Sequence, residues 1–474
     1  MIDTKAIRDR ILLLALKGEL VEQNPQDESA SNLIDKLCRN IGDRSFEPDF
    51  SEDEIPYDIP LSWSWCRLSD IGSTNIGLTY HPDDVTENGV IVARSSNIVN
   101  GKMDYSDLVK VSCSIRENQY LNSNDILICA RNGSKALVGK CAIYEGDSKK
   151  IAFGAFMAVF RTPLFRYVYY YFNTGVFKQN FISDDSKQIN QVTQNILKQS
   201  LIPIPPLSEQ TRIVERIEAI FEILDRIDAL QNQYTANQEA LKSKLIDTAI
   251  QGKLTEQLPE DGTAEELYRH IQEKKNALIR SKKFKKDKSK LEVNKEDIPF
   301  DIPDNWKWVC WGEIVNIVSA RRVHQSDWRK EGIPFYRARE IAKLADNGFV
   351  DNDLYISEEL YDEFSKSGVP SDGDLMVSAV GTLGKTYVVR ESDHFYYKDA
   401  SVLCFENYAV VDPYYLRYVM NSDMMKKQIE SNSGGTTVDT LTMVRMIKYL
   451  LPLPPLATQH RIVEKLDAVL SLIA

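Results

Sequence analysis

Nearly identical phrases recur about half a chain apart in this sequence. PIPPLSEQTRIVERI occupies residues 203–217, and PLPPLATQHRIVEKL occupies residues 452–466. A second pair stands earlier in each copy, IPYDIPLSWSW at residues 55–65 and IPFDIPDNWKW at residues 298–308. Because a chain of 474 residues exceeds one ordinary domain, these copies predict two homologous structural units, each with its own core.

The point at which the repeat is cut determines the expected architecture. ALKGELVEQNPQDESASNL at residues 15–33 matches AIQGKLTEQLPEDGTAEEL at residues 249–267 without a gap. The first stretch lies near the start of the chain and the second lies in its middle. The N-terminus therefore supplies the end of a repeat unit whose beginning lies at the C-terminus, and the two chain ends together make one unit.

The interrupted element is predicted to be a long helix. Ser208 is a plausible N-cap after the Pro-rich stretch, and Gly252 is a typical stop. Between them apolar residues recur at alternating gaps of four and three, with Gln231 and Gln238 in two of the slots. The apolar members of this heptad seam are Ile213, Ile217, Ile220, Leu224, Ile227, Tyr234, Leu241 and Leu245. About 43 residues at ~1.5 Å each predict a rod of roughly 60 Å.

Pieces of the same seam return at both ends of the chain. They are Ile462, Leu466, Val469 and Ile473 at the C-terminus and Ile7, Ile11 and Leu14 at the N-terminus. We expect the two pieces to pack end to end along the central helix and antiparallel to it, so that a pseudo-two-fold axis relates the halves. The alternative interpretation is a pair of unrelated amphipathic helices in separate domains.

The rest of the chain is predicted to form two globular domains of mixed α+β structure. Residues 46–202 and residues 291–451 each begin with a Pro-bounded Trp segment and continue with short β-rich runs, such as NDILICA and DLMVSAV. The helical parts are then residues 1–45, 203–290 and 452–474. The predicted fold is α+β, with two globular domains separated by two long antiparallel coiled-coil helices. We expect the tryptophans of these segments to be core residues and not platforms for bases: Trp63, Trp65, Trp306 and Trp308.

Composition narrows the classes of function. The net charge is −11, so any contact with nucleic acid must come from local patches on an acidic body. The basic run at residues 274–290 has an acidic counterpart at residues 39–54, and we interpret it mainly as a linker. The seven cysteines show neither metal-ligand spacing nor a disulfide pattern. With no apolar run long enough for a membrane span, we expect a soluble protein of the cytoplasm.

A search for catalytic motifs gives two near misses. In GSKALVGKC, Gly133 and Gly139 are one residue too far apart for a phosphate loop, and Cys141 replaces the Ser or Thr that holds magnesium. DPYY at residues 412–415 resembles an adenine-methyltransferase element, but no glycine-rich cofactor motif accompanies it. We therefore expect no catalytic centre and no metal site in this chain.

Polar loops between the predicted strands repeat in both halves. They carry the side chains that read base edges or hold phosphates, and their tips differ while the scaffold persists. Ordinary hairpins, with Arg94 and Arg337 in structural salt bridges, are the competing interpretation. The candidate DNA-contacting residues are Arg94, Ser95, Asn97, Arg131, Asn132, Ser134, Lys135, Lys140, Gln188, Asn190, Arg321, Arg322, Arg337, Arg339, Thr382, Lys385, Thr436 and Thr437.

The whole chain resembles a type I restriction–modification specificity (S) subunit. The resemblance rests on the doubled Pro-Pro-Leu phrase, on the helix ends ALKGEL and AIQGKL, and on the loops ARNGSKALVGK and AVGTLGK. It implies two target-recognition domains, each reading one half of a bipartite double-stranded DNA target, with the helices setting the unread spacer. Two modification (methyltransferase) subunits would dock along the helices, and restriction (translocase/nuclease) subunits would complete the complex.

The resemblance also implies where cofactors belong. S-adenosylmethionine would be bound by the modification subunits, and ATP and Mg²⁺ would be used by the restriction subunits, so that this chain itself binds none. Two other hypotheses stay open. One is the recognition half of a split adenine methyltransferase, which S-adenosylmethionine binding by the isolated chain would favour. The other is a coiled-coil scaffold that binds only protein.

Overall fold

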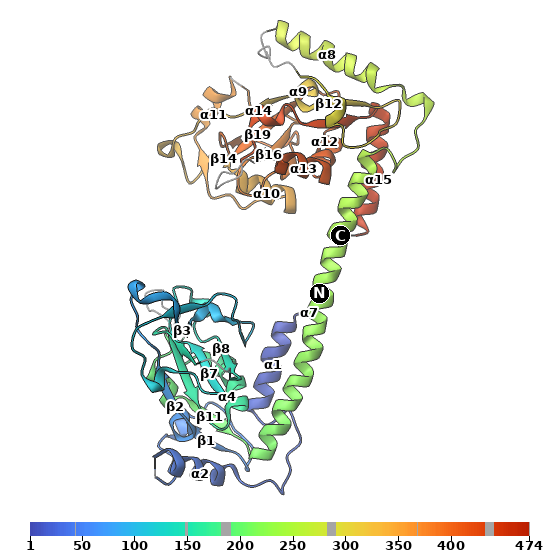
Figure 1. The fold of residues 1–474 in the computed structure, drawn as a ribbon. Coiled ribbons are helices and arrows are strands. Elements are labelled where there is room, and N and C mark those ends of the chain that lie inside the picture. Colours follow the sequence, from blue (N-terminus) through green and yellow to red (C-terminus); the bar gives the residue numbers. More distant parts are fainter. Residues whose placement is uncertain are drawn as a thin grey trace. The chain divides into compact units, whose positions relative to one another are not determined.

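The long helix α7 (Leu207–Ile250) runs through the middle of the chain and takes part in both of its compact units. The first unit is Met1–Asn232 and the second is Gln233–Ala474. This computed structural model, drawn in Figure 1, describes residues 1–42, 44–146, 150–181, 191–281, 291–366, 368–431 and 440–473. Over these residues, no helix has the length and apolar character that crossing a membrane requires.

The first unit is built on a four-stranded antiparallel sheet of order β2-β10-β7-β8. Its strands are β2 (Ser73–Ile76), β10 (Met157–Arg161), β7 (Asp125–Cys129) and β8 (Cys141–Tyr144). A three-stranded sheet of order β6-β3-β9 lies in the same unit, and β3 pairs with β9 in parallel. Its strands are β6 (Val109–Val111), β3 (Val85–Ala93) and β9 (Ile151–Phe153). Two ladders complete the strands: β1 (Ser64–Arg67) with β11 (Leu201–Ile204), and β4 (Ile98–Val99) with β5 (Lys102–Met103).

Over the described residues, the second unit repeats this topology except for the ladder of β4 with β5. The order β13-β19-β16-β17 matches the four-stranded sheet, and β15-β14-β18, with β14 and β18 parallel, matches the three-stranded one. These strands are β13 (Val315–Val318), β19 (Val402–Asn407), β16 (Leu375–Ser378), β17 (Thr386–Val388), β15 (Tyr355–Ile356), β14 (Ile333–Tyr336) and β18 (Tyr396–Tyr397). The ladder of β12 (Lys307–Cys310) with β20 (Leu450–Leu453) corresponds to β1 with β11. The predicted α+β repeat is confirmed.

Short helices follow the same pairing. Those of the first unit are α2 (Ala30–Gly42), α3 (Leu68–Ile71), α4 (Phe165–Phe172), α5 (Gly175–Lys178) and α6 (Gln194–Gln199). Their counterparts are α8 (Ala264–Arg280), α9 (Trp311–Ile314), α12 (Pro413–Met420), α13 (Asp423–Ser431) and α14 (Met443–Met446). The second unit also has α10 (Ala338–Asn347) and α11 (Glu358–Ser365) between β14 and β16.

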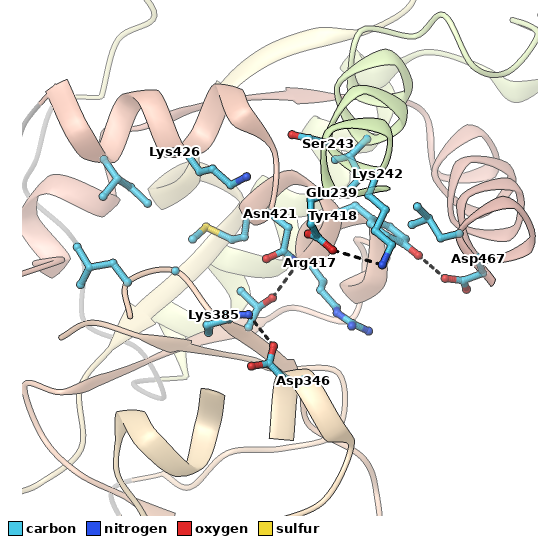
Figure 2. A pocket seen from close by; sticks show the side chains of 18 of the residues that line it. Glu239, Lys242, Ser243, Asp346, Lys385, Arg417, Tyr418, Asn421, Lys426 and Asp467 are labelled. Atoms are coloured by element: carbon cyan, nitrogen blue, oxygen red, sulfur yellow. Dashed lines mark hydrogen bonds and ion pairs between the residues drawn. The ribbon is translucent and has the colours of Figure 1, made fainter. Parts of the chain in front are cut away.

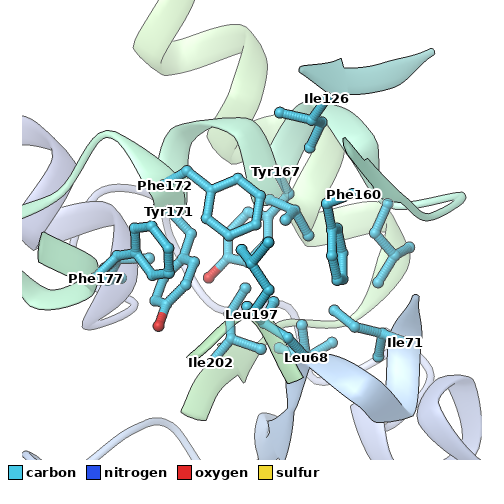
Figure 3. Close-up of a cluster of buried hydrophobic side chains, with 14 of the residues drawn as sticks. Leu68, Ile71, Ile126, Phe160, Tyr167, Tyr171, Phe172, Phe177, Leu197 and Ile202 are labelled. Carbon is cyan, nitrogen blue, oxygen red and sulfur yellow. The ribbon is translucent and has the colours of Figure 1, made fainter. Parts of the chain in front are cut away.

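An aromatic core explains why the Pro-rich phrase is repeated. Figure 3 shows the cluster of the first unit, in which Tyr167 lies among buried aromatic and aliphatic side chains. The Tyr167 hydroxyl donates to the carbonyl oxygen of Pro203 at 2.8 Å, and Tyr415 donates to that of Pro452 at 2.7 Å. A proline carbonyl in β11 and another in β20 thus each accept a hydrogen bond from a buried tyrosine hydroxyl that would otherwise be unsatisfied. Trp63, Trp65 and Trp306 are buried, as predicted.

In each unit a terminal helix pairs with its own part of α7. Helix α1 (Thr4–Leu16) lies beside the first part of α7 in Figure 1, with Arg8 bonded to Asp225 and Asp228 at 2.8 Å each. Helix α15 (Leu456–Ser471) packs on the last part through Ile462 and Leu466. Leu12, Ala15 and Leu16 of α1 share a core with Ile213 and Ile217, and residue 473 contacts residue 238, so both pairs are antiparallel.

The seam is shorter than predicted. Tyr234 and Leu241 are 60% and 47% exposed, although the heptad pattern places both in the seam. Gln231 binds the backbone of Ile2, and Gln238 donates to the carbonyl of Ile473 at 2.8 Å. These glutamines therefore hold the ends of the terminal helices instead of filling positions inside a continuous seam. The predicted cap is also wrong: α7 begins at Leu207, and Ser208 donates to Asp27 at 2.6 Å.

In each unit an ion pair forms near the start of the helix that follows the Pro-rich phrase, which is α7 or α15. It joins that helix to the segment that precedes the globular domain of the same unit. In the second unit Asp261 accepts from Arg461 at 2.7 Å and from Thr458 at 2.9 Å. In the first unit the equivalent Asp27 accepts from Arg212 at 2.7 Å. The hydrogen bonds from Arg461 lower the pKa of Asp261 to about 2. This contact stabilises the folded second unit as long as the carboxylate is ionised.

Replacing Asp261 with Asn should therefore destabilise the second unit in a pH-dependent way. A pKa near 2 in the folded state against an ordinary 3.8 corresponds to at most about 2 kcal/mol at neutral pH. Because the folded pKa is the lower one, this stabilisation is complete above about pH 4 and disappears as the pH falls toward 2. Urea denaturation of wild type and Asp261→Asn at pH 7 and pH 3 measures it. Equal stabilities at pH 7 would contradict the argument.

Candidate nucleic-acid interface

Three polar segments that are distant in sequence converge in the first unit. Asn132, in the loop after β7, donates to the hydroxyl of Ser95, in the turn after β3, at 3.0 Å. In the same loop Lys140 donates to the carbonyl of Ile98 at 2.9 Å. The backbone of Val192 donates to the carbonyl of Ala130 at 2.9 Å, which brings the segment before α6 alongside. The predicted polar loops thus lie close together at the ends of these strands.

The second unit brings the corresponding segments together by one bond of the same kind and one that differs. The backbone of Leu441 donates to the carbonyl of Ala379 at 2.9 Å, as Val192 does to Ala130. Lys385, in the loop after β16, donates to Asp346 of α10 at 2.6 Å. Gln188, Asn190, Thr436 and Thr437 were also predicted to contact DNA, and they lie outside the described residues.

The loop after β7 presents accessible hydrogen-bond donors in the first unit. Arg131, Ser134 and Lys135 are exposed, and Asn132 is half-buried. Within the described part of the chain neither Arg131 nor Lys135 has an acidic partner. An arginine and a lysine that have no acidic partner among the described residues can neutralise phosphates or donate to guanine. In the second unit the equivalent loop is shorter, and Thr382 is its exposed polar residue.

Other predicted contacts in the first unit are engaged inside the protein. Asn97 is 1% exposed, and its amide donates to the carbonyls of Asp104 and Asp107 at 2.9 and 2.8 Å. Arg94 pairs with the carboxylate of Asp107 at 2.7 Å, and Lys140 is committed to a backbone carbonyl. Asn97 cannot reach a base, because burial and two hydrogen bonds fix it. Arg94 holds the turn after β3, as the competing salt-bridge interpretation stated.

The arginines of the second unit are neutralised by nearby acids. Arg337 bonds Glu340 at 3.0 Å and Asp353 at 2.8 Å, while Arg339 bonds the same two carboxylates. Glu340 is fully buried. Burial acts to raise the pKa of Glu340, but hydrogen bonds from Arg337 and Arg339 outweigh it, and the pKa is lowered. Two cations with two anions leave no net charge here for a phosphate.

The remaining predicted arginines are partly paired at the surface. Arg321 bonds Glu363 at 3.1 Å and lies over the ring of Phe364, with 4.2 Å to the centroid. Arg322 bonds Asp399 at 2.9 Å. Because both guanidinium groups belong to exposed residues, they can exchange these carboxylates for phosphates, as surface ion pairs contribute little.

A cavity of about 590 Å³ opens in the second unit between α7, α10, α12, α13 and α15 (Figure 2). Its charged side chains are largely paired: Lys242 with Glu239 at 3.5 Å and Lys385 with Asp346 at 2.6 Å. The Tyr418 hydroxyl donates to the carboxylate of Asp467, also in the wall. The cavity has a mixed polar and apolar lining that is close to charge balance, so it adds little cationic surface to the interface.

Metal and thiol chemistry has no evident basis in the residues that can be described. Among them, no group of three or more His, Cys, Asp or Glu side chains is placed to hold a metal ion. All seven cysteines are free, and burial raises the pKa of Cys66 and Cys404 well above the ordinary thiol value. A thiol with a raised pKa is a poor nucleophile at neutral pH.

Sequence reasoning missed one feature of the interface. Phe156, between β9 and β10, is 63% exposed and accepts backbone hydrogen bonds from Ala130 at 2.9 Å and Arg131 at 3.1 Å. Ile76, at the end of β2, is 51% exposed. Phe156 stands in an apolar run that predicts a strand, and Ile76 lies in a stretch for which no element was predicted, so sequence patterning carried no signal that either is exposed.

Comparison with known proteins agrees with this architecture. The model of the type I restriction modification DNA specificity domain matches twice, at residues 60–238 and 303–474. The EcoAI specificity subunit of Escherichia coli is 24% identical over 529 residues, which cover 98% of this chain and 89% of that protein. The EcoKI specificity subunit of Escherichia coli (strain K12) is 30% identical over 207 residues, 42% of this chain and 44% of that protein.

A solved structure shares the fold. A chain from work on complex assembly and conformational transition of the type I R-M system superimposes with a TM-score of 0.58 at 19% identity, over 88% of this chain and 92% of that chain. The repeated sheet topology, the long helix and the two matches of one family model lead to the same assignment. This chain belongs to the family of type I restriction modification DNA specificity proteins.

Proposed function

We propose that this chain is the sequence-reading subunit of a type I restriction–modification complex and that each unit reads one half of a bipartite DNA target. One observation carries the proposal. The same backbone bond joins two of the three polar segments in both units, from Val192 to Ala130 and from Leu441 to Ala379. Yet the side chains at the tips differ, with Arg131 in the first unit where Val380 stands in the second. A common scaffold with different tips suits two readers of different sequences.

The proposed domain limits follow from the same repeat. Residues 46–202 and 291–451 would be the target-recognition domains, and residues 1–45, 203–290 and 452–474 the helical parts. The helix pairs α1–α7 and α7–α15 would set the spacer and dock two modification subunits. Exposed apolar side chains on α7, including Ile223 and Leu230 at 57% and 64% exposure, support a protein-binding role for this helix.

Partner subunits would supply the chemistry. S-adenosylmethionine would be held by the modification subunits, and ATP with Mg²⁺ would be used by the restriction subunits. The net charge of −11 and the internally paired arginines support a division in which partner subunits provide much of the phosphate binding.

The experiment is methylome sequencing of a host with and without this gene. Loss of the gene should erase one interrupted motif. The double variant Arg131→Ala, Lys135→Ala should lower methylation or relax base choice in one half of that motif only, because both side chains are exposed in one unit. The matched control is Arg116→Ala with Lys198→Ala, two exposed cations of the same unit outside the three segments.

Two outcomes would contradict the proposal. If deletion of the gene changed no methylated motif, the chain would not be a specificity subunit of an active modification system. If the motif depended on the gene but responded to no loop variant in either unit, the protein-only scaffold would be favoured. Binding of S-adenosylmethionine by the isolated chain would favour the split methyltransferase instead.

A further inference from the structure

We propose that Ile76 and Phe156 form the walls of a methyl-reading pocket that recognises one thymine in the half-site of the first unit. The inference rests on the proposed function, because it assigns a specific base contact to the loops already described. It adds two residues outside the candidate set to the specificity determinants, and it names the chemical group that they contact.

The pocket is a hollow of about 290 Å³ at the edge of the four-stranded sheet. Ile76 and Phe156 stand at its rim with exposed side chains, and Ala130, Met157 and Val192 line it further in. The lining is thus mainly apolar. Its size suits a small apolar group with part of the ring that carries it.

Polar donors border the hollow on the side of the interface. Arg131 and Gln191 belong to its lining, and both are exposed residues. Arg131 is tied to the pocket through its backbone, which donates to the carbonyl of Phe156 at 3.1 Å. An apolar wall beside an arginine and a glutamine matches the major-groove edge of DNA, where the thymine methyl group stands beside base donors and acceptors.

Exposure of both walls at one place needs an explanation. A single exposed apolar side chain on a surface is ordinary, but an isoleucine and a phenylalanine that face one hollow form a patch. DNA offers few apolar groups in its grooves, and the C5-methyl of thymine is the one that phenylalanine and similar side chains contact in the major groove. Thymine is therefore the occupant that the chemistry selects.

The second unit shows that the scaffold does not require these residues. Its backbone bond from Ala379 goes to the carbonyl of Ser401, so Ser401 occupies the place of Phe156. The register that pairs Val318 with Cys404 puts Ser319 in the place of Ile76, which pairs with Ala158. With Val380 in the place of Arg131, the second unit has neither the apolar walls nor the arginine. The pocket is a property of the first unit, as expected of a specificity determinant.

The test uses the assembled complex with its methyltransferase subunits and duplexes of its own target. Each thymine of both half-sites is replaced in turn by deoxyuridine, which removes only the methyl group. Wild-type complex should bind one of these duplexes about fivefold more weakly, the effect of withdrawing roughly one methyl from apolar contact. Phe156→Ala should bind that duplex and the unmodified target equally, while every other deoxyuridine substitution keeps its wild-type effect.

Controls keep this test independent of folding. Leu61→Ala removes a fully exposed apolar side chain of the same unit and should keep the wild-type sensitivity at every thymine. Phe156→Leu retains an apolar wall and should restore part of the fivefold effect. Because the readout is the difference between two duplexes for one protein, partial loss of folded complex cancels.

The failure of this inference is distinguishable from the failure of the proposed function. If gene deletion erased a motif but no thymine lost its methyl dependence in Phe156→Ala, the pocket would be refuted and the specificity role would stand. A first half-site without thymine would refute the pocket in the same way. If gene deletion left every motif intact, the specificity role itself would fail.

Discussion

Replacing Gly252 with Ala should lower the free energy of unfolding of the second unit by about 3 kcal/mol. Gly252 follows α7 with φ +73°, a left-handed conformation that an alanine adopts only at a cost of about 1 kcal/mol. Its added Cβ would lie 2.5 Å from Cγ and 2.7 Å from Cδ of Pro303, and 3.3 Å from Trp306. A proline ring cannot rotate away, so overpacking adds about 1–3 kcal/mol.

The chain offers a matched control for the backbone part of this cost. Gly381 has φ +71°, but a Cβ built on it would meet nothing within 4 Å. Gly381→Ala should therefore lose only about 1 kcal/mol. Denaturant titration followed by hydrogen exchange of second-unit peptides measures both variants. Equal losses would show that contact with Pro303 contributes nothing to the joint.

The same joint exists in the first unit, where Gly18 has φ +72° and its added Cβ would lie 2.4 Å from Cγ of Pro60. The sequence predicted this correspondence, since ALKGEL and AIQGKL aligned without a gap. It could not predict the reason, because Pro60 and Pro303 are distant in sequence from the glycines that they contact. A repeat therefore identifies equivalent positions before it explains them.

The heptad periodicity predicted which face of α7 is apolar, but it did not predict how much of that face is buried. Ile213, Ile217 and Leu224 are buried as the heptad required, whereas Tyr234 and Leu241 are exposed. The pattern is a property of one helix, but burial also depends on where the partner helices end. Gln231 and Gln238 mark those ends on either side of Tyr234, and only the coordinates of α1 and α15 could show it.

The candidate interface was predicted at the level of segments and less well at the level of side chains. Three loops were expected in each unit, and their described parts do converge. Arg131 and Lys135 are exposed, but Asn97 is buried and the predicted Arg337 lies in an ion-pair cluster. An arginine in a polar loop has the same sequence signature whether its partner is a phosphate or an internal carboxylate. The partner Glu340 lies in α10, a helix where the sequence predicted a polar loop.

Arg337→Ala should lower the free energy of unfolding of the second unit by about 3 kcal/mol at pH 7. The change leaves the buried Glu340 with Arg339 as its remaining cationic partner, and a buried carboxylate that loses one of two ion pairs is costly. Because the pKa of Glu340 is lowered in the folded protein, its ion pair stabilises above about pH 4 and weakens as the pH falls. The difference between wild type and variant should therefore stay constant from pH 7 to about pH 5 and shrink as the pH falls below about 4.

A structural role and a DNA-reading role of Arg337 make opposite predictions for a second substitution. Glu340→Gln in the Arg337→Ala background removes the stranded charge and should restore part of the lost stability. Arg339→Ala, whose side chain is 54% exposed, should lose only about 1 kcal/mol. If Arg337→Ala left the free energy of unfolding unchanged but altered the half-site that is recognised, Arg337 would be a base-reading residue. If both the loss and the rescue are observed, Arg337 has a structural role in the second unit. The bases of its half-site must then be read by exposed residues such as Thr382.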